Sequence, residues 1–162
     1  MLVFPALHEM SSSIEQELVA NVHIAVTNLI KYIPKQVAST EKQKLMTLLV
    51  KLLHSEDIEV LQQTLQLIDA DSDSGLLEQH VDTLLPILIK LSICSSSMQV
   101  RISSLKCLAT MSKLTTLLIV PHMNSVIKKL LPALDDKKRL VRKEAVKTRN
   151  IWCMVRDGHE SH

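Results

Sequence analysis

A weak internal repeat with a period of about 40 residues limits the folds open to this chain more than any other feature. The repeated unit is a valine followed four residues later by a small side chain. It occurs three times, at Val60 with Thr64, at Val100 with Ser104, and at Val141 with Ala145. A period of this length is typical of arrays built from stacked pairs of α-helices.

The repeated unit has a simple physical explanation. An apolar residue lies seven positions before each valine (Leu53, Ile93 and Leu134) and follows an amphipathic apolar run. We expect the first helix of each pair to end there, and an Asp or Ser in the short turn to cap the second helix. The valine and the small residue then share one face of the second helix, where a small side chain lets two helices approach closely.

Composition agrees with helices throughout. The chain has 2 Gly and 5 Pro in 162 residues, its aromatic content is 2%, and no long alternating strand pattern is visible. Apolar residues recur at helical spacing, as in Leu45, Leu48, Leu49 and Leu52. The sequence therefore predicts an all-α fold, an α-solenoid of about four HEAT-type helix pairs. The expected helices cover residues 2–10, 14–33, 41–54, 57–69, 76–93, 97–113, 121–134 and 136–156.

The domain organisation follows from the same pattern. Residues 1–156 form the predicted HEAT-repeat C-terminal domain, and residues 157–162 form a polar tail. Because a solenoid needs polar ends and residues 1–5 are apolar, we interpret the domain as a fragment of a longer array. The alternative is a short free-standing helical protein. Three widely spaced cysteines (Cys94, Cys107 and Cys153) do not form a disulfide framework and favour a reducing compartment.

Motifs that carry chemistry are missing from the sequence. No Cys-x-x-Cys or His-x-x-x-His pair is present to hold a metal, and a glycine-rich phosphate loop is ruled out because Gly75 and Gly158 are the only glycines. Ser95-Ser96-Ser97 lacks the flanking glycines of a nucleophile elbow. The sequence predicts a protein that is not an enzyme and that has no cofactor and no metal site.

Charge is strongly polarised along the chain. The stretch 52–89 holds eight acidic residues and no Lys or Arg, whereas the stretch 128–149 holds nine basic residues against three acidic ones. A basic end of this kind steers acidic partners by long-range attraction. The predicted partner-binding residues are Lys137, Lys138, Arg139, Arg142, Lys143, Lys147, Arg149 and Trp152.

Several alternatives stay open for these residues. Charged side chains often only solvate a helix face, an Arg after the repeat valine often bonds a neighbouring carboxylate within the fold, and a lone Trp is often a core residue. Direct nucleic-acid binding is poorly supported, because Trp152 is the only aromatic platform near the basic segment.

The amino-acid sequence of the basic segment resembles that of a known protein family. Asp-Asp-Lys-Lys-Arg-Leu-Val-Arg-Lys-Glu-Ala-Val at residues 135–146, followed by Arg149 and Trp152, closely resembles the C-terminal end of the MMS-nineteen family. His-Val-Asp-Thr-Leu at 80–84 and Met-x-Val-Arg-Ile at 98–102 also resemble the final repeats of that family. The resemblance covers most of the chain from about Pro5, and the tail after Trp152 departs from it.

The resemblance implies a function. The family is a large HEAT-repeat adaptor of the cytosolic iron–sulfur assembly targeting complex, which works with a WD-repeat subunit and a small MIP-eighteen-like subunit. Together they deliver clusters to apo-proteins such as DNA polymerases and a TFIIH helicase. The resemblance further implies roles in nucleotide excision repair, a location in cytoplasm and nucleus, and a link to the mitotic spindle. The rival function is a generic HEAT or armadillo scaffold, such as a transport receptor or a phosphatase scaffold.

Overall fold

The chain folds into α-helices arranged as a short solenoid. The computed structural model describes residues 39–70 and 77–157, and within these ranges it contains no strand. The elements are α2 (Ser39–Leu53), α3 (Ile58–Ala70), the 3-10 turn η1 (Glu78–His80), α4 (Val81–Cys94), α5 (Met98–Met111), α6 (Thr116–Lys129), α7 (Leu131–Leu134) and α8 (Arg139–Asp157). The predicted all-α class is confirmed. The predicted helices 2–10 and 14–33 lie outside the described residues.

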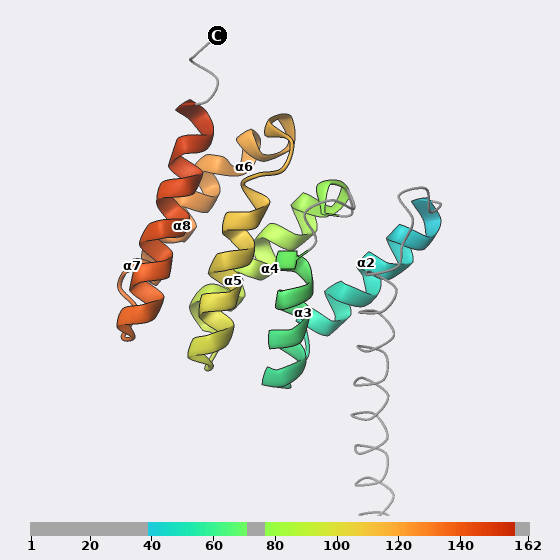
Figure 1. Cartoon of the computed structure of the whole chain (residues 1–162), viewed down its shortest axis with the longest axis horizontal. Helices are drawn as coiled ribbons and strands as arrows, with labels where there is room; N and C mark the ends of the chain where they lie inside the picture. Colours follow the sequence, from blue (N-terminus) through green and yellow to red (C-terminus); the bar gives the residue numbers. More distant parts are fainter. Residues whose placement is uncertain (1–38, 71–76, 158–162) are drawn as a thin grey trace, which may run out of the picture.

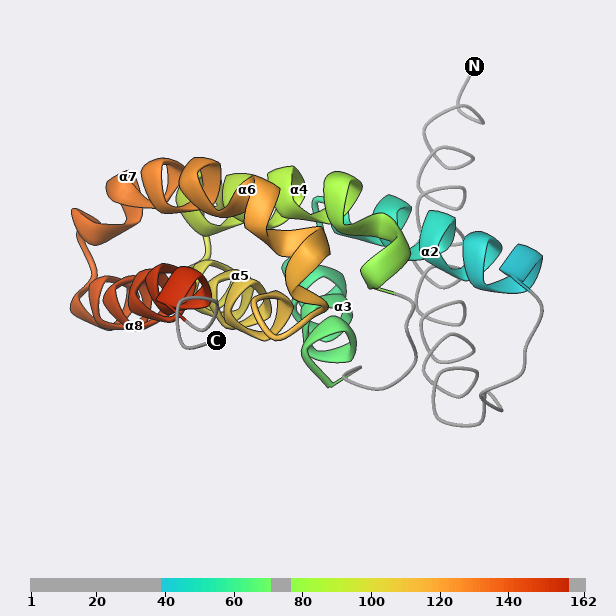
Figure 2. The same cartoon turned by 90° about the horizontal axis from the view of Figure 1, so that it is seen from above.

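The helices form two layers. Figure 2 shows α4, α6 and α7 side by side in one layer, with α2 at its end, and α3, α5 and α8 in the other. Each pair therefore contributes one helix to each layer, and the three described pairs are α2 with α3, α4 with α5, and α6–α7 with α8 (Figure 1). None of the described helices is long and apolar enough to cross a membrane.

The sequence repeat corresponds to a repeated contact in the structure. Val60, Val100 and Val141 are all buried, and so are the small residues Thr64, Ser104 and Ala145 that follow them. The Thr64 and Ser104 hydroxyls each donate to the carbonyl one turn earlier, at 2.7 Å in both cases. The two hydroxyls are thus satisfied inside their own helices, and the small side chains leave room for a neighbouring helix.

The turns before the second helices repeat as well. Ser55, Ser95 and Asp136 each use a side-chain oxygen to accept from the backbone N–H two residues later, at 3.1, 3.3 and 2.8 Å. This bond fixes the entry angle of the following helix. The three turns are therefore equivalent in space as well as in sequence.

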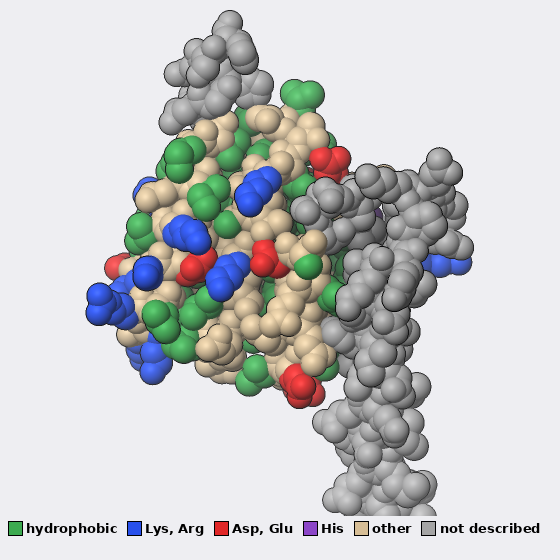
Figure 3. Space-filling view, viewed as in Figure 1, with side chains coloured by type: hydrophobic (Ala, Val, Ile, Leu, Met, Phe, Trp, Pro, Cys, Tyr) green, Lys and Arg blue, Asp and Glu red, His purple; other side chains and the backbone are tan. Residues whose placement is uncertain are grey.

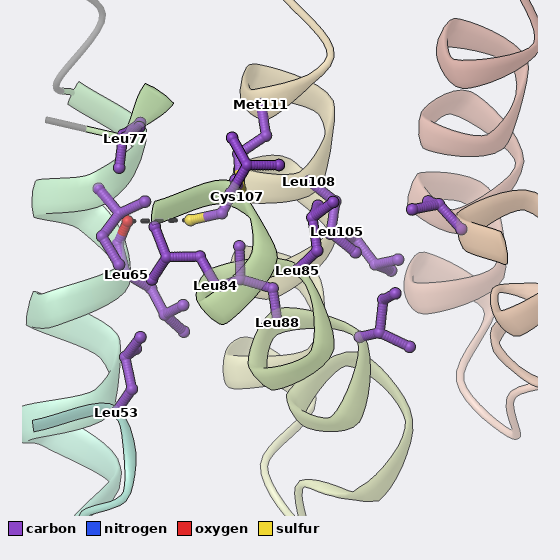
Figure 4. Close-up of a cluster of buried hydrophobic side chains, with 14 of the residues drawn as sticks. Leu53, Leu65, Leu77, Leu84, Leu85, Leu88, Leu105, Cys107, Leu108 and Met111 are labelled. Atoms are coloured by element: carbon purple, nitrogen blue, oxygen red, sulfur yellow. Dashed lines mark hydrogen bonds between the residues drawn. The ribbon is translucent and has the colours of Figure 1, made fainter. Parts of the chain in front are cut away.

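The core runs between the two layers, and leucine is its commonest residue. Leu65 on α3, Leu84 and Leu88 on α4, and Leu105 on α5 are fully buried (Figure 4). Because these residues lie at helical spacing, each helix turns one apolar stripe into the same cluster. The cluster continues without a break to the residues of α8.

One predicted helix is placed wrongly by the sequence. The expected helix 121–134 begins earlier, at Thr116, with Pro121 inside it, and it breaks at Leu130 before the short α7. Pro121 is tolerated because it lies on an exposed side of α6, where water can reach the carbonyl that lost its partner. Pro132 follows the break directly, since it has no N–H to continue the α-helical pattern.

Candidate docking surface at the end of the helix stack

Three of the basic residues predicted to bind a partner lie together where α8 begins. Lys137, Lys138 and Arg139 are all exposed, and Lys and Arg side chains cluster at this end of the face shown in Figure 3. The chain is held in place here by Asp136, whose Oδ1 accepts from the Lys138 N–H at 2.8 Å. The three cations therefore project from a fixed turn.

These cations lie where a helix disfavours positive charge. Asp57 and Ser97 occupy the N-cap positions of α3 and α5, where their side-chain oxygens accept backbone N–H groups at 2.9 and 3.3 Å. Lys138 occupies the same position in α8, because its carbonyl accepts the first helical bond, from the Arg142 N–H at 3.1 Å. A lysine offers no acceptor, and its charge opposes the partial positive charge of the helix N-terminus.

The basic surface continues along the exposed side of α8. Lys143 and Lys147 are exposed one turn apart. Leu140 and Met154 lie beside them at helical spacing and are 56% and 60% exposed. Sequence reasoning missed these apolar residues, although a leucine and a methionine among lysines on one helix face indicate a mixed apolar and basic contact surface.

Arg142 has a role in the fold. Its Nη1 donates to the backbone carbonyls of Asp136 and Lys137 at 2.7 and 3.3 Å. Arg101 makes the equivalent bond to the Ser95 carbonyl at 2.8 Å, and it also pairs with the Asp136 carboxylate, with Nε 2.9 Å from Oδ2. The alternative that an Arg after the repeat valine bonds a neighbouring carboxylate therefore holds for Arg101, whereas Arg142 bonds backbone carbonyls of its own turn.

Trp152 does not belong to the surface. Its side chain is 0% exposed, and its indole N–H donates to the Leu108 carbonyl on α5 at 2.8 Å. It shares a buried stripe with Val141, Ala145 and Thr148, because these positions are separated by four, three and four residues. The prediction that Trp152 binds a partner directly is wrong, and Trp152 instead joins α8 to α5.

Of the two cysteines whose side chains the structure describes, Cys107 belongs to the core and Cys153 lies at the surface. Cys107 is buried, its thiol donates to the Leu65 carbonyl at 3.1 Å, and desolvation by burial, with a smaller effect of the Asp69 charge, raises the pKa of the thiol far above its usual range. Cys153 is exposed. In the described part of the chain, no three His, Cys, Asp or Glu side chains come together as a metal site.

Comparison with known proteins gives a consistent result. A family model described as RNAPII transcription regulator C-terminal, MMS19_C, matches residues 1–112. The match ends before the basic segment. The MMS19 nucleotide excision repair protein homolog of Xenopus laevis is 39% identical over 133 residues, covering 81% of this chain and 13% of that protein. The human homolog is 36% identical over 156 residues, covering 93% of this chain and 15% of that protein.

More distant relatives agree. The Dictyostelium discoideum homolog is 32% identical over 166 residues and covers 95% of this chain and 15% of its own length. The chain thus spans only about one seventh of the length of these relatives. Because the family model matches more than half of the chain, the chain belongs to the MMS19 family.

Proposed function

We propose that this chain is a non-enzymatic adaptor of the cytosolic iron–sulfur assembly targeting complex. In this role it docks the WD-repeat and MIP-eighteen-like subunits and helps deliver clusters to apo-proteins of DNA repair and replication, including a TFIIH helicase, in cytoplasm and nucleus and at the spindle. Family membership supports this role, since relatives are named as nucleotide excision repair and DNA repair/transcription proteins. The cluster is cargo, so the adaptor needs no ligands of its own.

One observation supports a docking role above the others. Lys137, Lys138 and Arg139 surround the positive end of α8 in place of the capping oxygens that α3 and α5 carry. Positive charge there weakens the helix, so stability does not explain these residues. Departures from local folding rules are concentrated at functional sites, and we interpret this one as a surface kept for an acidic partner.

The partner we propose is a protein. Sequence-tolerant binding of single-stranded nucleic acid depends on exposed aromatic side chains on which bases stack. Trp152 is the one aromatic residue in the described ranges, and it is fully buried. An acidic protein surface needs only the lysine and arginine side chains, with the exposed Leu140 and Met154 adding apolar contact.

Co-elution tests the proposal. The 162-residue chain is mixed with the purified WD-repeat and MIP-eighteen-like subunits and passed over a sizing column. We expect one peak that contains all three. Separate elution of the chain, or a complex with nuclear-transport or phosphatase subunits in its place, would favour the generic scaffold. A steep, salt-dependent shift of labelled DNA would favour nucleic-acid binding.

A further inference from the structure

Each second helix of the stack has a stripe of residues that faces the next pair. On α3 the stripe is Leu61, Leu65 and Ile68, which are buried where α5 covers them. The residues at the equivalent positions of α5 are Arg101, Leu105 and Leu108. On α8 they are Arg142, Val146 and Arg149, with Cys153 one turn further on, and we call these four residues the outer stripe.

The covered stripes are joined to the next helix by recurring bonds. The Cys107 thiol on α5 donates to the Leu65 carbonyl at 3.1 Å, and the Thr148 hydroxyl on α8 donates to the Leu105 carbonyl at 3.0 Å. Leu65 and Leu105 are equivalent, and the next equivalent carbonyl is that of Val146. At the start of the stripe, Arg101 holds the carboxylate of Asp136, which belongs to the turn before the covering helix.

The outer stripe has the equivalent residues, but no described helix covers them. Val146 is 48% exposed, whereas Leu105 at the equivalent position is 0% exposed. Arg142 makes the same carbonyl bond as Arg101, but no carboxylate among the described residues pairs with it. Arg149 is half-buried, and its Nε finds no hydrogen-bond partner within the described ranges. A partner carboxylate that reaches the guanidinium group of this half-buried arginine would form charged hydrogen bonds with it.

We propose that the outer stripe of α8 is a docking site for an acidic amphipathic helix of a partner protein, seated as a further layer of the stack. Its apolar face covers Val146, and a carboxylate before its first turn pairs with Arg142 as Asp136 pairs with Arg101. A second carboxylate reaches Arg149. A hydroxyl or thiol at its centre donates to the Val146 carbonyl, as Cys107 and Thr148 do to their own neighbours.

Charge decides between the candidate occupants. If a second copy of the chain bound here, one outer stripe would lie against another. The arginines of the two copies would then repel each other, which costs free energy. An acidic helix gains two charged hydrogen bonds and buries the valine. The inference rests on the proposed adaptor function only in taking the occupant to be a protein.

The test uses a synthetic helix with the full 162-residue chain. The probe has about 20 residues, with leucines on one face and glutamates at its start and beside the leucines. The control peptide replaces each Glu with Gln. Binding is followed by fluorescence anisotropy, and the alkylation rate of Cys153 is followed by peptide-resolved mass spectrometry. The variants are Arg149→Glu and Val146→Glu, with Lys106→Glu, an exposed site on α5, as the matched control.

We expect the acidic peptide to bind and to slow alkylation of Cys153. The control peptide, and each variant of the outer stripe, should bind about tenfold more weakly, while Lys106→Glu changes nothing. Equal binding to Val146→Glu, unchanged alkylation of Cys153, or a dimer of the chain that Val146→Glu disrupts would overturn the inference. The mixture contains no assembly subunits, so this result is separate from co-elution with them.

Discussion

Replacing Trp152 tests the packing of the last helix pair most sharply. The side chain is fully buried, and it is the only tryptophan of the chain. Truncating a buried tryptophan to alanine costs about 3–5 kcal/mol, because apolar contacts are lost and a cavity remains. Native domains have only about 5–15 kcal/mol of unfolding free energy, so Trp152→Ala should remove a large part of it.

Trp152→Phe separates packing from hydrogen bonding. Phenylalanine keeps an aromatic ring but loses the N–H that donates to the Leu108 carbonyl. That carbonyl still accepts from the Ser112 N–H at 3.3 Å, so it is not left unsatisfied. We therefore expect Trp152→Phe to cost less than Trp152→Ala, about 1–3 kcal/mol.

Urea unfolding followed by circular dichroism measures both variants. With a slope of about 1–3 kcal/mol per molar urea, Trp152→Ala should lower the midpoint by at least about 1 M. Cys153→Ala, at the exposed neighbouring position, is the matched control and should shift unfolding free energy by less than about 0.5 kcal/mol. The native emission of Trp152 should also be blue-shifted and resist acrylamide. A loss below about 1 kcal/mol in Trp152→Ala, with emission typical of a tryptophan in water, would refute the core position.

Two further predictions concern stability. A double-mutant cycle with Arg101→Gln and Asp136→Asn should give a coupling free energy of about 1–3 kcal/mol, because the side chains are each only 12% exposed; additive effects would contradict the contact between repeats. Because burial raises the pKa of Cys107, the folded chain favours the neutral thiol. The resulting contribution to the unfolding free energy is fully present below the unfolded thiol pKa of about 8.5 and falls as the pH rises above that value. Between pH 7 and 10 the melting temperature should therefore fall more for the unchanged chain than for Cys107→Ala. Parallel curves would show that the thiol ionises equally in the folded and unfolded states.

Much of the architecture was predictable because the repeat is a local pattern. The valine and the small residue four positions later lie on one helix face whatever surrounds them, so the second helices fall close to the expected ranges. The two prolines show the limit of this reasoning. Sequence alone does not reveal that Pro121 lies on a solvated side while Pro132 follows a break, because that depends on the neighbouring helix.

The candidate site was less predictable. Trp152 lies 11 residues after Val141, a spacing that places both on one helix face, so a signal for its burial was present. Two features depend instead on which helices cover α8: the exposure of Val146, and the lack of a carboxylate partner for Arg142 among the described residues. That is a property of the stack and not of the segment.

Charge reversal at the start of α8 tests the central claim most directly. Lys137, Lys138 and Arg139 are changed together to glutamate, and the control chain carries the same change in charge at the exposed Lys44, Lys51 and Lys113. Melting and affinity for the two assembly subunits are then measured in the same buffer. Acidic residues suit the first turn of a helix, so we expect the melting temperature of the α8 variant to be unchanged or higher. Affinity for the subunits should weaken strongly in the α8 variant only. Binding that stays unchanged, or melting that falls together with binding, would contradict the claim that these three residues serve a partner and not the fold.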